Sequence, residues 1–149
     1  MAKKTSKKVK ILIIEDEKSL VDLLLTKLEK EGYSVQAALD GEEGFKEIIR
    51  FLPDLILLDV VMPKMDGYEV LEKMHQEKIK IPVIIISNSG QPVEIEKTTK
   101  LGAVDHLIKT EFSAADVLEK VHKYLQDGGD ESNNRQAAII PTPKEGENV

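Results

Sequence analysis

The chain has 149 residues, no cysteine and a formal net charge of −6, which predicts one domain with a real core and excludes disulfides and thiolate metal sites. The first ten residues carry five lysines, and residues 126–149 carry two basic and five acidic side chains, which leaves −8 on the residues between them. Because contacts to phosphates of nucleic acid need a basic face, we expect no nucleic-acid partner for a domain this acidic.

The two ends of the chain differ in composition from the middle. Residues 1–8 are rich in lysine and predict a basic, disordered leader, because the apolar run that follows is too short for a signal peptide. Residues 127–149 are polar, acidic and rich in chain breakers, which predicts a disordered tail. Its one apolar segment, residues 137–141, is either inert or docks on a partner or on the domain itself. No segment approaches the ~20 apolar residues of a membrane span, so we expect a cytoplasmic protein without a membrane partner.

Residues 9–126 alternate between two patterns. Short apolar runs predict strands, and apolar residues that recur at a helical period predict amphipathic helices. The expected strands are, in chain order, Val9–Ile14, Tyr33–Ala38, Asp54–Asp59, Pro82–Ile86 and Val104–Lys109. The expected helices are Lys18–Glu31, a helix that starts after the Asp40-Gly41 turn, Tyr68–Glu77, Pro92–Leu101 and Ser113–Gln126. In the second helix we expect Phe45, Ile48 and Ile49 on the inner side, and Ser113 and Asp116 should cap the last helix.

Five strand–helix units in strict alternation predict an α/β fold, a doubly wound five-stranded parallel sheet of the flavodoxin-like type with helices on both faces. The strands are nearly uninterrupted in apolar character, as strands covered on both faces should be. With five strands, the commonest doubly wound order is 2-1-3-4-5, and its switch point lies between the first and third strands.

Polar side chains stand at the ends of four predicted strands, namely Glu15 and Asp16 at the first, Asp59 at the third, Ser87 at the fourth and Lys109 at the fifth. Because the carboxyl ends of parallel strands meet at one edge, we expect these side chains to share a crevice. Three carboxylates repel one another, and Mg²⁺, or Mn²⁺ in its place, would relieve that repulsion. A hydroxyl and an ammonium suit an incoming phosphoryl group, and the carboxylate of Asp59 is a candidate nucleophile for forming an aspartyl phosphate.

Each of these residues also has a purely structural explanation. An acidic run after a strand favours the start of a helix through the helix dipole. Ser87 alone would be a turn residue, and Lys109 alone a solvated strand end. Only their joint position indicates a site.

Together the residues resemble the receiver domains of two-component response regulators, over roughly Val9–Gln126. The resemblance is carried by the acidic pair Glu15-Asp16, Asp59 with the loop Met62-Pro63-x-Met65-Asp66-Gly67, Ser87, and Gly102-Ala103-x-Asp105-x-x-x-Lys109. It implies that Asp59 is the phosphoacceptor, that Asp16 binds magnesium directly and that Glu15 holds the metal through water. The backbone carbonyl of Val61 would be a third protein ligand.

For the remaining positions, the resemblance implies that Ser87 bonds the phosphoryl oxygens and that Lys109 pairs with them. His106 falls on the family's aromatic switch position. The implied function is a phosphoacceptor switch rather than an enzyme, and its donor is a histidine kinase or a phosphotransfer protein. Since no second domain follows in this sequence, we expect the output to be contacts with a downstream protein or transfer of the phosphoryl group onward.

Three positions depart from the family pattern. Thr110 replaces a proline whose preceding bond is commonly cis; a cis bond before threonine costs about 3–4 kcal/mol, so we expect a trans bond or a strained loop. Asn88 replaces a very small residue, and it either crowds the phosphoryl group or donates a hydrogen bond to it. His106 replaces a tyrosine or phenylalanine, which suggests the hypothesis that switching depends on pH.

Two other functions compete with the switch. The first is a receiver-like binding module that no longer accepts phosphate, for which Thr110 and Asn88 are the only hints. The second is an aspartate-nucleophile phosphatase of the haloacid-dehalogenase type. That class needs an acid two residues after the nucleophile, and Val61 holds that position here.

Overall fold

The structure, a computed structural model, describes residues 8–129. The predicted leader and tail therefore lie outside the described residues, except for residue 8 and residues 127–129. Those last three residues are helical, so the start of the predicted disordered tail was placed too early.

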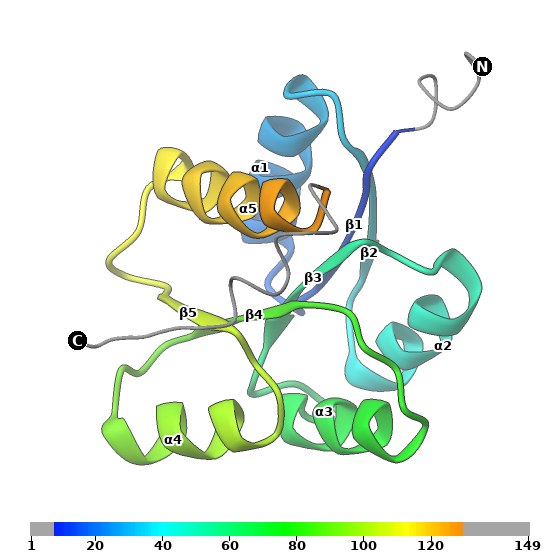
Figure 1. Cartoon of the computed structure of the whole chain (residues 1–149). Helices are drawn as coiled ribbons and strands as arrows, with labels where there is room; N and C mark the ends of the chain where they lie inside the picture. Colours follow the sequence, from blue (N-terminus) through cyan, green and yellow to red (C-terminus); the bar gives the residue numbers. More distant parts are fainter. Residues whose placement is uncertain (1–7, 130–149) are drawn as a thin grey trace.

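Five strands form one parallel sheet in the order β2-β1-β3-β4-β5, which confirms the predicted topology (Figure 1). The strands are β1 (Lys10–Ile14), β2 (Ser34–Ala38), β3 (Leu55–Asp59), β4 (Val83–Ser87) and β5 (Asp105–Ile108). In register, Ile14 lies beside Leu58, Asp59 beside Ile86, and Ser87 beside Ile108. The carboxyl ends of the four strands β1, β3, β4 and β5 therefore finish along one edge of the sheet.

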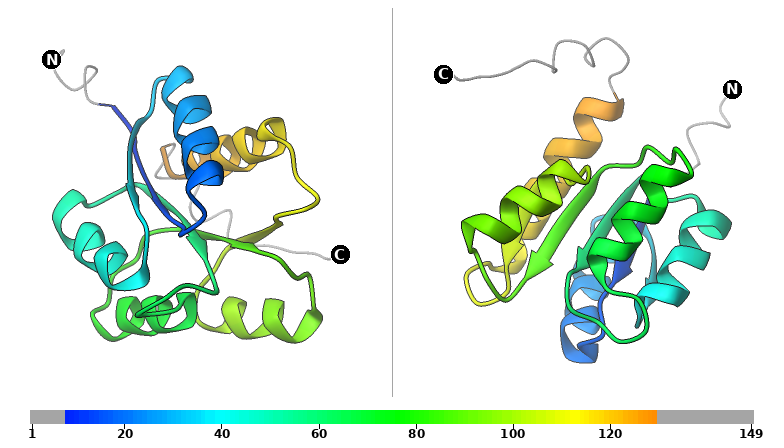
Figure 2. Two further views of the ribbon diagram at one scale, coloured as in Figure 1. Left: turned by 180° about the vertical axis from the view of Figure 1, so that it is seen from behind. Right: turned by 90° about the horizontal axis from the view of Figure 1, so that it is seen from below.

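Five helices cover the two faces of the sheet. They are α1 (Lys18–Lys30), α2 (Gly41–Phe51), α3 (Gly67–Gln76), α4 (Pro92–Lys100) and α5 (Ala114–Gly129). Helices α1 and α5 lie on one face, and α2, α3 and α4 lie on the other (Figures 1 and 2). Within the described residues, no helix combines the length and the apolar character that a membrane span requires.

The buried strands explain why the apolar runs lack alternation. Ile11 and Ile13 pack in the core beneath α1 and α5, whereas Leu12 and Ile14 pack in the core beneath α2 and α3. Each such side chain contributes roughly 1.5–3 kcal/mol when fully buried. Both faces of the sheet are thus apolar, as strands covered by helices on two sides require.

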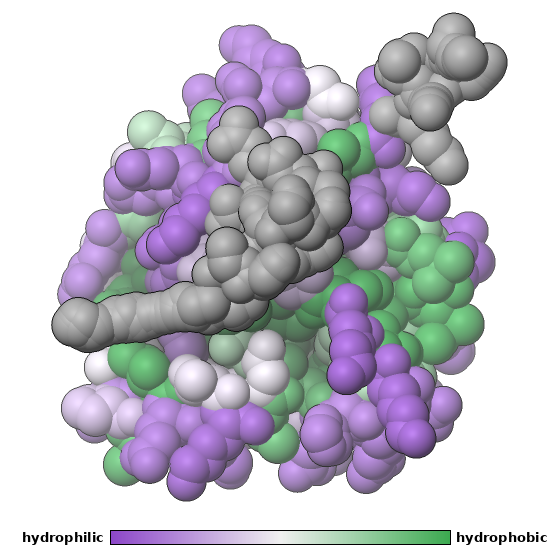
Figure 3. All heavy atoms as spheres, viewed as in Figure 1, coloured by the Kyte–Doolittle hydropathy of each residue, from purple (hydrophilic) through white to green (hydrophobic). Residues whose placement is uncertain are grey.

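In helix α2, one of the three residues predicted to lie on the inner face is exposed instead. Ile48 is fully buried, but Ile49 is 52% exposed. Successive helical residues are turned by about 100°, so Ile49 rotates toward solvent when Ile48 faces the sheet. Figure 3 shows apolar residues on the surface over α2, where Ile49 and Leu52 are exposed.

The last helix is capped as predicted. The Ser113 hydroxyl accepts a hydrogen bond from the Asp116 N–H at 3.3 Å, and the Asp116 carboxylate accepts one from the Ser113 N–H at 2.9 Å. This reciprocal pair is a capping box, and it fixes where α5 begins after β5.

Candidate functional site

Three carboxylates meet at the carboxyl-terminal edge of the sheet. Glu15 follows β1, Asp16 is next in the chain, and Asp59 ends β3; one oxygen of each lies within 4.8 Å of the others. Glu15 is fully buried and Asp59 is 2% exposed, whereas Asp16 faces solvent. The end of one strand and the turn after its neighbour thus bring three negative groups to one point, as expected where parallel strands end.

Lys109, just beyond β5, inserts its ammonium between these groups. Its Nζ lies 2.9 Å from Glu15 Oε2, 3.4 Å from Asp59 Oδ2 and 3.4 Å from Glu17 Oε1. Burial acts to lower the pKa of Lys109, but the hydrogen bond to Glu15 and the charge of Asp59 outweigh it and raise that pKa. The lysine therefore stays charged and bridges β1, β3 and β5.

One ammonium does not offset the negative charge of the cluster. Burial and then the charge of Glu15 raise the pKa of Asp59 from 3.8 to about 7, although Lys109 acts in the opposite direction. Without a cation, Asp59 therefore holds a proton at a pH where an ordinary aspartate is ionised.

One oxygen of Glu15 lacks a hydrogen-bond partner. Glu15 Oε2 accepts hydrogen bonds from Lys109 Nζ at 2.9 Å and from the Glu17 N–H at 2.9 Å, but the buried Oε1 has no partner among the described residues. Buried polar atoms are normally satisfied, so an orphaned carboxylate oxygen needs an explanation. Carboxylate oxygens are the ligands that Mg²⁺ prefers. The donor set therefore fits a hard divalent cation.

Glycines allow the loop after β3 to fold back onto the site. A Cβ on Gly67 would lie 2.5 Å from the carbonyl oxygen of Asp59 and 2.8 Å from the Cα of Val60, so a larger residue would push the strand end away. A Cβ on Gly41 would lie 1.8 Å from the carbonyl oxygen of Met65 in the same loop. The backbone N–H of Val61 donates a hydrogen bond to Asp59 Oδ1 at 3.4 Å, and the side chain of Val61 is exposed to solvent.

Ser87 ends β4 beside the carboxylates but bonds elsewhere. Its hydroxyl contacts the carboxylate of Glu94 in the first turn of α4 and the carbonyl oxygen of Ser89, the latter at 2.8 Å. No hydrogen bond joins it to the cluster in the described part of the chain. Glu94 was not among the residues predicted for the site, and no motif of the chain marks it.

His106 lies on β5 and contacts α4 rather than the carboxylates. Its Nε2 is 2.6 Å from the hydroxyl oxygen of Thr98, a fully buried residue of α4. Burial lowers the pKa of His106, and Lys120 adds to this, while Asp105 and Glu94 oppose it.

The peptide bond between Lys109 and Thr110 is trans. This is one of the two outcomes expected where Thr110 replaces the proline of the family pattern.

The geometry agrees with a comparison against known families. The sequence profile described as "Response regulator receiver domain" matches residues 11–122 of the chain. The chain belongs to this family. The match confirms the resemblance, and members of the family are phosphoacceptor signalling domains that bind Mg²⁺ through acidic residues and are generally not enzymes.

Curated relatives extend the family assignment. The chain is 39% identical over 117 residues to the alkaline phosphatase synthesis transcriptional regulatory protein PhoP of Bacillus subtilis (strain 168), covering 78% of this chain and 48% of that protein. It is 35% identical over 119 residues to the DNA-binding dual master transcriptional regulator RpaA of a Synechocystis species, covering 78% and 49%. The chain thus spans about half the length of the curated relatives it matches.

Solved receiver domains share the fold. A CheY-like response regulator receiver domain protein from Methanospirillum hungatei JF-1 matches with a TM-score of 0.79 and 28% identity, covering 85% of this chain and all of that one. The receiver domain of the Francisella response regulator 1452 matches with a TM-score of 0.75 and 30% identity, covering 79% and 97%. Both agree with the receiver topology found here.

Proposed function

We propose that this protein is a phosphoacceptor switch of a two-component phosphorelay and that Asp59 accepts the phosphoryl group. The observation that carries the proposal is the position of Asp59 at the end of β3, between Glu15 and Lys109. The donor is the phosphohistidine of a histidine kinase or phosphotransfer protein. One oxygen of the Asp59 carboxylate forms the new P–O bond as the P–N bond breaks, and that electron pair leaves with the donor imidazole.

A divalent cation completes the proposed site. Glu15, Asp16, Asp59 and the backbone carbonyl of Val61 would hold Mg²⁺, and Mn²⁺ suits the same oxygen ligands. When bound, the ion neutralises negative charge where the phosphoryl group meets the carboxylates. The buried Glu15 Oε1, which has no partner among the described residues, supports this assignment.

The chain's own residues then respond to the new charge. Lys109 stays ionised and pairs with a phosphoryl oxygen. The Ser87 hydroxyl leaves Glu94 and donates to the phosphoryl group, which releases one contact between β4 and α4. A second contact, between His106 and Thr98, links α4 to β5. Phosphorylation thus shifts the population of α4 positions instead of creating a new fold.

The output is proposed to pass through protein contacts on the surface formed by α4, β5 and α5. Several curated relatives are named as transcriptional regulators, and this chain matches about half of their length. The region between the lysine-rich start and residue 126 carries −8, so we propose no direct contact of the receiver domain with nucleic acid.

Intact mass spectrometry tests the proposal. The wild-type protein, incubated with Mg²⁺ and acetyl phosphate, should gain the mass of one phosphoryl group, and the gain should be absent in Asp59→Asn and when Mg²⁺ is omitted. A folded wild-type protein that gains no phosphoryl group would instead favour the receiver-like binding module. Continuous turnover of a phosphomonoester would favour the phosphatase, whose second acid is replaced here by the exposed Val61.

A further inference from the structure

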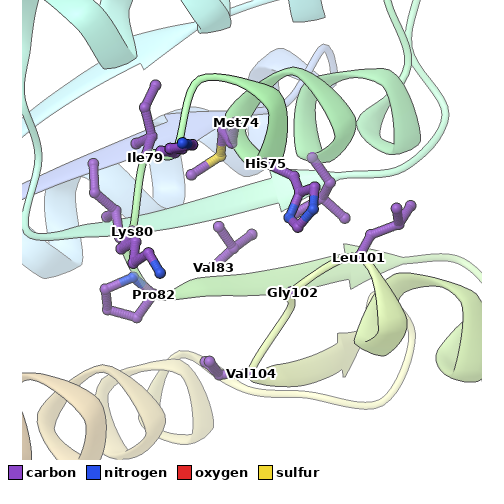
Figure 4. Close-up of a pocket in the computed structure, with 12 residues that line it drawn as sticks. Met74, His75, Ile79, Lys80, Pro82, Val83, Leu101, Gly102 and Val104 are labelled. Carbon is purple, nitrogen blue, oxygen red and sulfur yellow. The ribbon is translucent and has the colours of Figure 1, made fainter.

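A cavity of about 630 Å³ opens at the amino-terminal ends of the strands, opposite the end at which Asp59 lies. It lies where α3 and α4 end and where β4 and β5 begin, and Met74, Val83 and Leu101 surround it (Figure 4). Binding pockets for ligands commonly enclose about 300–1,000 Å³ and are mostly apolar. The residues of the proposed phosphoacceptor site do not line this cavity. It is therefore a hollow of binding size that phosphoryl transfer does not use.

The rim of this cavity is basic. The exposed residues His75, Lys78 and Lys80 stand around the apolar walls, and no acidic residue is among the described residues that line it. Such a lining favours an occupant that is apolar in the middle and acidic on its flanks. A purely apolar ligand would leave the lysines without a counter-charge.

Helix α5 ends at the end of the molecule where this cavity opens. The Tyr124 hydroxyl lies 2.8 Å from the Asp105 carboxylate and 3.1 Å from the carbonyl oxygen of Val104, and Val104 lines the cavity. Figure 4 shows the ribbon of α5 beside Val104, and the right panel of Figure 2 shows α5 ending at the same end of the molecule as α3. Gly129 follows Tyr124 by five residues, about 7.5 Å along the helix axis.

The residues that follow Gly129 in the sequence have the chemistry that the cavity favours. Residues 137–141 read Ala-Ala-Ile-Ile-Pro. Asp130, Glu131 and Arg135 stand before them and Lys144, Glu145 and Glu147 after them, so each flank carries a net charge of −1. Ile139 is ten residues beyond Gly129, a reach of up to about 33–36 Å for an extended chain. The segment is therefore long enough to turn back to the cavity.

We propose that residues 137–141 dock in this cavity of the same molecule, with Ile139 and Ile140 against its apolar walls and the flanking acids facing Lys78 and Lys80. A short linker holds the segment at an effective concentration on the order of millimolar, so even weak docking is populated. This inference does not depend on phosphoryl transfer.

NMR of methionine methyl groups tests the docking in the full-length protein. Met74 lines the cavity, while Met62 and Met65 lie in the loop after β3 and serve as internal references. The double variant Ile139→Asp/Ile140→Asp should shift the Met74 methyl signal and leave the two reference signals unchanged. Val149→Asp, a matched change outside the segment, should leave all three unchanged. Lys78→Glu/Lys80→Glu should shift Met74 in the same direction as the isoleucine variant.

Two results would overturn the proposal. The first is a Met74 signal that is the same in the wild type and in the double isoleucine variant. The second is a difference between them that disappears on dilution, together with a wild-type dimer in sedimentation, because a second copy would then supply the segment.

Discussion

The Ser87 hydroxyl donates a hydrogen bond to the Glu94 carboxylate and thereby ties the end of β4 to the first turn of α4. Ser87 is 4% exposed, and its oxygen also accepts from the Ser89 N–H at 2.9 Å. A hydroxyl has one proton to donate, for which Glu94 and the Ser89 carbonyl oxygen at 2.8 Å are both acceptors, so a donation to a phosphoryl group excludes the donation to either of them. Glu94 therefore stabilises the state in which Ser87 does not contact the phosphoryl site.

Replacing Glu94 by glutamine should favour the phosphorylated state. The neutral amide accepts a weaker hydrogen bond than the carboxylate; a loss of about 1 kcal/mol corresponds to roughly fivefold tighter binding of a phosphoryl mimic. Calorimetric titration with beryllofluoride in Mg²⁺ measures this. Glu96→Gln is the matched control, because Glu96 lies on the same helix and forms an exposed ion pair with Lys100 at 3.6 Å. Equal affinities of Glu94→Gln and wild type would contradict this role.

Removal of the Lys109 charge should destabilise the fold in the absence of Mg²⁺. Lys109→Met leaves the buried Glu15 and Asp59 without their cation, and breaking such a pair costs about 3 kcal/mol. Urea unfolding should show this loss, and added Mg²⁺ should reduce it. Lys120→Met is the control, because its partner Asp105 lies 3.0 Å away at a more exposed position and the loss should stay below about 1 kcal/mol. A Lys109 variant as stable as wild type would argue against a compact carboxylate cluster.

The raised pKa of Asp59 predicts a stability that falls with pH in metal-free buffer. Between about pH 4 and pH 7 the unfolded chain releases the Asp59 proton while the folded protein retains it, so the unfolded state binds fewer protons and folding loses free energy. Asp59→Asn should therefore be stabilised relative to wild type by an amount that grows over this range, on the order of 1–4 kcal/mol.

Chemical unfolding in a chelator at several pH values measures that difference. Asp22→Asn, an exposed aspartate in α1 that pairs with Lys18, should run parallel to wild type. A difference between Asp59→Asn and wild type that is constant from pH 4 to pH 7 would show that Asp59 titrates normally.

The lowered pKa of His106 places its titration on the acid side of its ordinary value of 6.5. Below about pH 6.5 the unfolded imidazole takes up a proton before the folded one, so the stability contributed by neutral His106 is lost as the pH falls. If switching depends on the charge of His106, it should therefore respond to pH below 6.5, the ordinary pKa of histidine. NMR titration of the ring signals should give a midpoint below 6.5; a midpoint at or above that value would contradict the burial of this side chain against Thr98.

The fold was largely predictable because each βα unit carries its own local signals. The apolar strands and the glycine and proline breaks indicate element number and type, and a parallel sheet with right-handed crossovers leaves few possible orders. Exact ends were less predictable: α5 continues to Gly129, and Ile49 faces solvent although it neighbours the buried Ile48. An apolar pattern alone does not show which of two adjacent apolar residues on a helix faces the sheet.

The site was predictable only in part, and for a physical reason. Side chains at strand ends converge because the sheet is parallel, which is why Glu15, Asp16, Asp59 and Lys109 were expected together. The contact of Ser87 with Glu94 and the contact of His106 with Thr98 depend on how α4 packs on the sheet. No spacing pattern in the sequence marks Glu94 or Thr98.

The location of the transferred group tests the central claim most directly. Phosphorylated protein is reduced with borohydride, which converts an aspartyl phosphate to homoserine, and the chain is then digested and mapped by mass spectrometry. We predict homoserine at position 59 in the wild-type protein and none in the unphosphorylated control. Homoserine at another aspartate, or a phosphoryl group that borohydride leaves in place on a serine or histidine, would contradict the assignment of Asp59 as the phosphoacceptor.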